Sequence, residues 1–152
     1  HIAKNIFDEH MPEPNQINKK LYLNKEIDKR DLLTLPVGTC SEEVLRKNIN
    51  VCFQYLNAWL NGNGCVPINN AMEDADTAEI SRAQIWQWLR YNVKLSNGKK
   101  VTEKLFTEIA NEELDKFKGC ERYAKTKEIF MTLCTSPELI DFLTPMCYNA
   151  IH

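Results

Sequence analysis

The sequence predicts an all-α protein, a small helical bundle of about five helices. Apolar residues recur with helical spacing in several segments, and Gly, Pro and Asn separate these segments. Capping residues stand where the segments begin, and no alternating run is long enough for a strand of useful length. With 152 residues, 43% of them hydrophobic, the chain can bury the core of one domain.

The first long helix is expected at residues 40–61. Thr39 and Glu42 have the spacing of a capping box, and Gly62 and Gly64 end the apolar periodicity. Further helices are expected from about residue 71, at 102–117 with Thr102 as cap, at 120–134, and after the Ser136-Pro137-Glu138 signal, with a shorter helical segment at 1–11.

Three other segments carry local signals. Ser81 and Gln84 repeat the capping signature, so the helix from residue 71 is expected to end near Ile80 and a second to begin at Ser81. This break would place Asp74 on a short, separately oriented helix. Asn97-Gly98 predicts a turn. Residues 12–38 are expected to be irregular, with short apolar contacts from Leu21, Tyr22, Leu23 and Ile27.

Composition argues against nucleic-acid and membrane partners. The net charge is −2 and the Lys and Arg residues are scattered, so no strongly basic surface is predicted. No apolar run approaches the roughly 18 to 20 residues needed to cross a bilayer, and HIAKNIFDEH lacks the order of a signal peptide. We therefore expect a soluble, cytoplasmic protein.

The six cysteines are expected to be reduced and mostly buried. They occur without a CxxC pair and mostly within apolar helical patterns, at positions 40, 52, 65, 120, 134 and 147. A structural zinc site is not predicted, since the three histidines lie in or near the termini. A redox or metal-binding role of the cysteines is a minor alternative.

The acidic cluster of Glu73, Asp74 and Asp76 has two interpretations. Carboxylates in the first turn of a helix stabilise it by about 0.3 to 1 kcal/mol, which is the commoner reason for such a cluster. Alternatively, the loop before it presents one carboxylate as a general base. Cys65 in that loop is more typical of an inert thiol, because no histidine lies near it in the sequence.

A structural role is the simpler interpretation of the tryptophans and of Arg82, which follow in the sequence. Trp86 and Trp88 lie on or beside an apolar helical stripe, which favours core packing over ligand stacking. Arg82 could bind an anion, but Glu79 lies three residues before it, so a local ion pair is at least as plausible.

Residues 48–90, NINVCFQYLNAWLNGNGCVPINNAMEDADTAEISRAQIWQWLR, closely resemble the signature region of malate synthases of the shorter A type. The resemblance continues in IFDEHMPEPNQ (6–16) and SPELIDFLTPMCYNAI (136–151), so it covers nearly the whole chain. It implies an acyltransferase of the glyoxylate cycle, which condenses acetyl-CoA with glyoxylate to give malate and CoA.

The resemblance also implies a domain organisation. Malate synthases join a TIM barrel to a C-terminal helical domain that plugs the barrel mouth. Residues 1–11 would be a remnant of the last barrel helix, 12–38 the linker, and 39–152 the helical domain. A barrel needs about 250 residues, so this chain would be a fragment whose partner is the barrel domain of the same protein. The ligands of Mg²⁺ would lie in that barrel, and the fragment alone would be inactive.

The site residues follow from the same resemblance. Asp74 matches the family's catalytic base, Met72 matches a methionine that contacts bound CoA, and Cys65 resembles a cysteine that lines the same pocket. Two positions depart from the family pattern, which usually has a bulky residue at Ala71 and alanine at Asp76. The alternative function is a free-standing helical protein-interaction module without catalysis. The alternative location is a peroxisome or glyoxysome, although NAIH lacks the Ser-Lys-Leu type of targeting tripeptide.

Overall fold

The computed structural model describes residues 1–15, 28–35 and 37–151. The chain divides into two compact units, His1–Val37 and Gly38–His152. None of the described helices is both long and apolar enough to cross a membrane.

The first unit contains two short helices. α1 (Ile2–His10) confirms the helix predicted there, and its apolar side chains are exposed. α2 (Lys29–Leu33) is a single helical turn within a segment predicted to be irregular. Asp28 begins it with a capping box, because its side chain accepts from the Asp31 N–H and the Asp31 side chain accepts from the Asp28 N–H. The predicted apolar contacts of Leu21, Tyr22, Leu23 and Ile27 lie outside the described residues.

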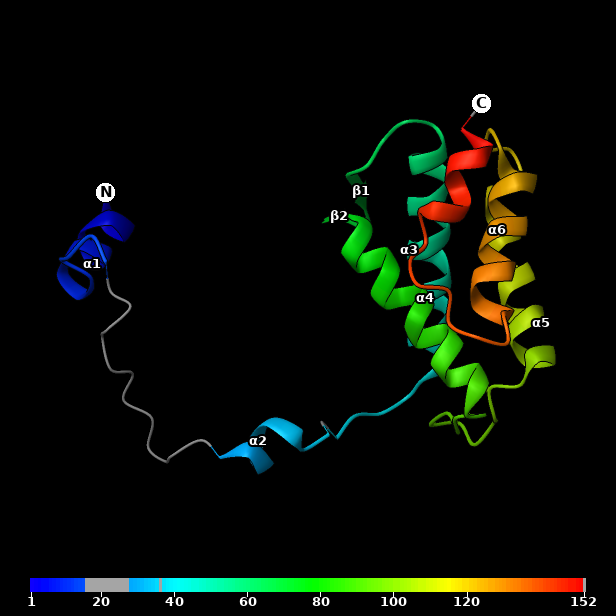
Figure 1. The fold of residues 1–152 in the computed structure, drawn as a ribbon, viewed down its shortest axis with the longest axis horizontal. Coiled ribbons are helices and arrows are strands. Elements are labelled where there is room, and N and C mark those ends of the chain that lie inside the picture. The colour runs from blue at the N-terminus through cyan, green and yellow to red at the C-terminus, as the bar shows by residue number, and fades with distance from the viewer. Residues whose placement is uncertain (16–27, 36, 152) are drawn as a thin grey trace. The chain divides into compact units, whose positions relative to one another are not determined.

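The second unit is a helical bundle centred on one helix, and it confirms the all-α prediction (Figure 1). The central α3 packs against the other three long helices. The elements are α3 (Glu42–Leu60), β1 (Val66–Ile68), β2 (Ala71–Glu73), α4 (Ala75–Arg90), α5 (Glu103–Leu114), the 3-10 helix η1 (Asp115–Phe117), α6 (Tyr123–Thr135) and the 3-10 helix η2 (Pro145–Ala150).

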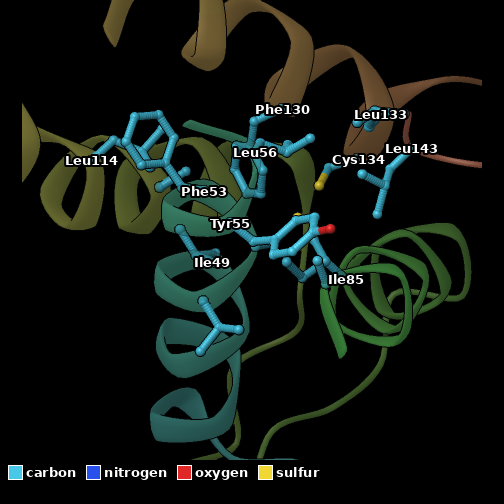
Figure 2. Packing of buried hydrophobic residues seen from close by; sticks show 14 of the residues in the cluster. Ile49, Phe53, Tyr55, Leu56, Ile85, Leu114, Phe130, Leu133, Cys134 and Leu143 are labelled. Atoms are coloured by element: carbon cyan, nitrogen blue, oxygen red, sulfur yellow. The ribbon is translucent and has the colours of Figure 1, made fainter. Parts of the chain in front are cut away.

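The core lies where the apolar stripe of α3 meets the other helices. Figure 2 shows side chains of α3 directed toward α4 and α6, with Phe53 and Leu56 among them. The ring of Phe53 stacks on that of Phe117 at 5.5 Å and meets Phe130 edge-on at 6.5 Å. Burying each such side chain stabilises the fold by about 1.5 to 3 kcal/mol. These aromatic contacts therefore attach α3 to η1 and α6.

The helix termini agree with the sequence prediction to within a few residues. The cap of α3 is Ser41, whose Oγ accepts from the Val44 N–H at 3.2 Å, rather than the predicted Thr39. Thr102 caps α5 as predicted, through a bond from the Leu105 N–H to its hydroxyl. The predicted turn at Asn97-Gly98 is also confirmed, since Gly98 has a φ of +86° that suits glycine.

Two predictions about the segment from residue 71 are wrong. Residues 71–73 form a strand instead of a first helical turn, and Asp74 is the N-cap of α4. Asn69 and Asn70 have φ values of 51° and 63°, which close a two-residue hairpin between β1 and β2. α4 then runs without a break through Ser81, whose side chain is buried. Burial in the core explains this serine better than a capping role.

The helix predicted after Ser136 is also absent from the described structure. Ser136 is the C-cap of α6, and the chain runs irregularly until η2 begins at Pro145. Side chains of α4 bind its backbone instead: Trp86 Nε1 donates to the Ser136 carbonyl at 2.8 Å, and Glu79 accepts from the Leu143 N–H at 3.1 Å. These bonds satisfy backbone groups without a helix, so the local capping signal does not decide the conformation.

The cysteines are free thiols in several environments. Cys52, Cys134 and Cys147 are buried and Cys40 is half-buried, as predicted for most of them, whereas Cys65 and Cys120 are exposed. Burial raises the pKa of the Cys147 thiol to about 11, which keeps it protonated at neutral pH. A structural role for the buried thiols agrees with this environment.

Arg46 joins α3 to α5 through acidic side chains. Its guanidinium lies 2.9 Å from Glu42, 2.8 Å from Glu112 and 3.0 Å from Glu113. The hydrogen bond from Arg46 lowers the pKa of Glu42. For Glu113, burial alone would raise the pKa, but hydrogen bonds from Lys116 and Arg46 together outweigh it and the pKa is lowered.

Replacement of Arg46 by Met should therefore destabilise the domain in a pH-dependent way. Carboxyls with lowered folded-state pKa values contribute stability above their ordinary pKa of 4.5, and this stability is lost as the pH falls through the folded value. We expect Arg46→Met to lower the free energy of unfolding by about 1 to 3 kcal/mol at pH 7, and by much less at pH 3. Urea unfolding at both pH values measures these free energies.

Lys118→Met removes an exposed ion pair with Asp115 and is the control, which should change the free energy of unfolding little. Equal losses of stability for Arg46→Met at both pH values would contradict the assigned role of the Arg46 ion pairs.

Candidate functional site at the head of helix α4

The β1–β2 hairpin brings the predicted site residues together. In its antiparallel register Val66 faces Glu73 and Pro67 faces Met72. Cys65 immediately precedes Val66 and Asp74 immediately follows Glu73, so the two residues flank the same paired end of the hairpin although nine positions separate them in the sequence. The hairpin therefore brings the thiol and the carboxylate to its open end, where α4 begins.

Side chains alternate between the two faces of this hairpin. Ile68 is buried and packs on the core, and Val66 is half-buried on the same face. The residues of the opposite face are all exposed, namely Cys65, Pro67, Met72 and Asp74. Met72 is 66% exposed, so its side chain is accessible on this face. The three predicted site residues thus share one accessible face.

Asp74 is held by its role as helix cap. Its backbone is extended, and its Oδ1 accepts from the Asp76 N–H at 3.1 Å and the Thr77 N–H at 3.3 Å. Both bonds use Oδ1, so Oδ2 has no hydrogen-bond partner among the described residues. One oxygen fixes the carboxylate at the positive end of α4, and the other is free to accept a proton from a ligand.

The interpretation of the acidic residues as helix-stabilising groups is therefore correct for Asp74. A role of Asp74 as a general base is compatible with it. Asp76 lies one residue inside α4, with an exposed side chain. Glu73 is half-buried on the other face of the hairpin, where it lines a cavity of about 320 Å³ between α3 and α4 together with Val44, Lys47, Val51 and Ile80. The three clustered acids thus have three different surroundings.

Tyr55 of α3 forms a hydrogen bond to the loop before β1. Its position in the helical pattern of the sequence did not predict this contact. Its side chain extends from α3 toward α4 (Figure 2), and its hydroxyl donates to the Gly64 carbonyl at 3.0 Å. Burial raises the pKa of Tyr55, and the negative charge of Asp74 raises it further. The only sequence signal was a phenol on a stripe of aliphatic side chains.

The remaining candidates are structural. Arg82 is fully buried and pairs with Glu79, as the local ion-pair interpretation predicted. Trp88 is buried, and Trp86 is half-buried with its Nε1 bonded to the chain after α6, which confirms a packing role. Among the described residues, no three His, Cys, Asp or Glu side chains lie close enough together to hold a metal ion.

Comparison with known families decides where the chain belongs. Residues 39–151 match the malate synthase C-terminal family. The chain belongs to this family. It is 46% identical over 159 residues to the malate synthase of Myxococcus xanthus, and this match covers 99% of the chain and 29% of the relative. Malate synthase A of Escherichia coli is 44% identical over 90% of the chain, and a Glycine max protein named glyoxysomal malate synthase is 47% identical over 82%.

The match to the malate synthase C-terminal family confirms the resemblance noted in the sequence. The site residues were predicted from that resemblance. The chain spans less than a third of the length of these relatives, 29%, 27% and 24% respectively. Other domains therefore accompany the matched region in each of those proteins. The match to the Myxococcus xanthus protein covers 99% of the chain, so it includes most of the first unit as well as the helical bundle.

Proposed function

We propose that this domain supplies the catalytic base of a malate synthase, and that Asp74 is this base. The observation that carries the proposal is the free Oδ2 of a carboxylate that a helix cap fixes on an exposed face. A base must be positioned as well as accessible, because general-base catalysis requires hydrogen-bond reach to the proton that is removed. Asp74 meets both conditions.

The proposed reaction begins with transfer of a methyl proton from acetyl-CoA to Asp74 Oδ2. The electron pair of the broken C–H bond forms the enolate, whose methylene carbon then attacks the aldehyde carbon of glyoxylate and makes the new C–C bond. The π electrons of the aldehyde move to its oxygen, and the resulting alkoxide takes up a proton to become the hydroxyl of malyl-CoA. Water cleaves the thioester of the resulting malyl-CoA, which releases malate and CoA. Mg²⁺ would polarise the glyoxylate carbonyl, and we assign its ligands to the rest of the protein and not to this chain.

Met72 and Cys65 are proposed to contact acetyl-CoA beside this base. They flank Asp74 on the same exposed face of the hairpin, and Met72 offers a flexible apolar surface that suits a thioester chain. The exposed thiol of Cys65 has no histidine near it in the sequence, so we assign it a contact role rather than a nucleophilic one.

The partner of this domain is proposed to be the TIM barrel of the same protein. We assign residues 1–11 to the last barrel helix, 12–38 to the linker and 39–152 to the domain that closes the barrel mouth. Separating the base from the rest of the site would let domain closure exclude water and orient acetyl-CoA. The compartment is proposed to be the cytoplasm; the glyoxysomal name of the Glycine max relative makes an organelle the alternative.

A CoA-release assay tests the proposed function. Acetyl-CoA, glyoxylate and Mg²⁺ are supplied to the 152-residue chain and, separately, to the full-length protein that contains it. We expect CoA release from the full-length protein and none from the chain alone. Activity of the chain alone would refute the division of the site, and an inactive full-length protein would favour the interaction module.

A further inference from the structure

A buried tyrosine forms a hydrogen bond to the loop that carries Cys65. Tyr55 lies on α3 with 1% of its surface exposed, and its hydroxyl donates to the carbonyl of Gly64, the residue before Cys65. Among the described residues, this is the only hydrogen bond that the Gly64 carbonyl receives. A buried phenol in an otherwise aliphatic and aromatic core usually has such a partner, because an unmet hydroxyl is costly.

The first half of this loop is fixed without Tyr55. After α3, the Gly62 N–H bonds to the Trp59 carbonyl at 2.9 Å, and the Asn63 N–H bonds to the Ala58 carbonyl at 2.9 Å. The loop then leaves the helix, and the β1–β2 pairing begins only at Val66. The bond from Tyr55 lies between these two fixed parts, at Gly64, the residue before Cys65.

The phenol of Tyr55 is protonated in this environment. Burial raises the pKa of Tyr55, and the negative charge of Asp74 raises it further. A raised pKa keeps the phenol protonated at neutral pH, so its hydroxyl can donate the hydrogen bond to Gly64.

We propose that Tyr55 is a positioning residue of the acetyl-CoA side of the site, which acts by holding Gly64 and thereby Cys65 at the end of the hairpin that also carries Asp74. This inference rests on the proposed function. Tyr55 itself does not touch the substrate; it determines the width of the hairpin opening into which the acetyl group would fit. A displacement of about 1 Å at such a site can cost about a hundredfold in rate.

The test is Tyr55→Phe in the full-length protein, which removes the hydroxyl and keeps the ring. We expect the KM for acetyl-CoA to rise about tenfold and kcat to fall, with the KM for glyoxylate unchanged. A second readout is independent of catalysis: in the 152-residue chain, Cys65 should react with a thiol reagent (DTNB) at least about threefold faster, relative to the other exposed thiol of this chain, Cys120.

Two control variants separate positioning from general stability. Tyr123→Phe removes a tyrosine hydroxyl bonded to Asp115 and should leave both readouts unchanged. Phe53→Leu loosens the core around Phe117 and Phe130 and should lower the melting temperature without changing the KM for acetyl-CoA or the Cys65 to Cys120 rate ratio. A shift in these readouts in Phe53→Leu as large as that in Tyr55→Phe would overturn the proposal.

The outcomes also distinguish this inference from the proposed function. If Asp74→Asn abolishes turnover while Tyr55→Phe leaves the KM for acetyl-CoA and the Cys65 to Cys120 rate ratio within twofold of wild type, only the positioning role is refuted. If Asp74→Asn retains turnover, the proposed function fails, and the reactivity of Cys65 still decides whether Tyr55 holds the loop.

Discussion

Replacement of Asp74 by Asn in the full-length protein is expected to lower kcat by about 10² to 10⁴-fold, the range that a general base contributes. The amide has no basic oxygen that can take the methyl proton of acetyl-CoA. Binding of glyoxylate should change little, since we place its contacts outside this chain. Steady-state CoA release, with kcat and both KM values determined, measures the effect.

Asp74→Asn separates the catalytic role of Asp74 from its capping role better than a change to alanine does. Asp74 Oδ1 caps α4, and asparagine caps a helix about as well as aspartate, so Asp74→Asn keeps the fold and removes the base. Asp74→Ala would also cost about 1 kcal/mol of helix stability and would confuse the two roles. Asp76→Asn, on the neighbouring exposed carboxylate, is the matched control and should have only a modest effect. Near-normal turnover of Asp74→Asn would refute the assignment of the base.

Arg82→Met is expected to give the largest loss of stability in this domain, about 3 kcal/mol at neutral pH. Arg82 is fully buried, pairs with Glu79 and donates to the Ile140 carbonyl. Removing it leaves Glu79 without its cation and frees the segment that crosses α4. Because Nε and Nη1 of Arg82 have no partner in the described structure, part of this pair's stabilisation is already offset. Urea unfolding of the 152-residue chain measures the difference.

Two further variants give this prediction its control. Arg90→Met, on the same helix but exposed, should change the free energy of unfolding by less than about 0.5 kcal/mol. Combining Arg82→Met with Glu79→Gln should recover part of the loss, because the uncompensated charge is removed. A single Arg82→Met variant as stable as Arg90→Met would show that the buried pair does not hold the C-terminal segment.

Periodicity and caps predicted the bundle well because its long helices bury continuous apolar stripes. The helix at 40–61 and the cap at Thr102 needed only local residues, and tertiary packing agrees with them. The helix expected after Ser136 was wrong for the opposite reason. There, Trp86 and Glu79 of a distant helix bind the backbone, and a local cap worth about 1 kcal/mol does not compete.

The candidate site was predictable only in part. Residue chemistry alone left Asp74 between a structural and a catalytic role, and the family resemblance selected it together with Met72 and Cys65. Their proximity could not be predicted, because strands of three residues carry almost no alternation and the hairpin turn is Asn-Asn rather than Asn-Gly. The role proposed for Tyr55 was hidden for a similar reason, since its partner is a backbone carbonyl of another segment.

By itself the sequence determined the helical class, which depends on residue type and local spacing, and its resemblance to the family selected Asp74 as the proposed base. Tertiary structure alone decided that Asp74 caps α4 with one oxygen and leaves the other free, and that Cys65 and Met72 share its exposed face. The physical reason is that strand register and side-chain burial depend on contacts between segments. In MEDAD, the second acid is the cap and proposed base, and the third lies within the helix that this cap begins.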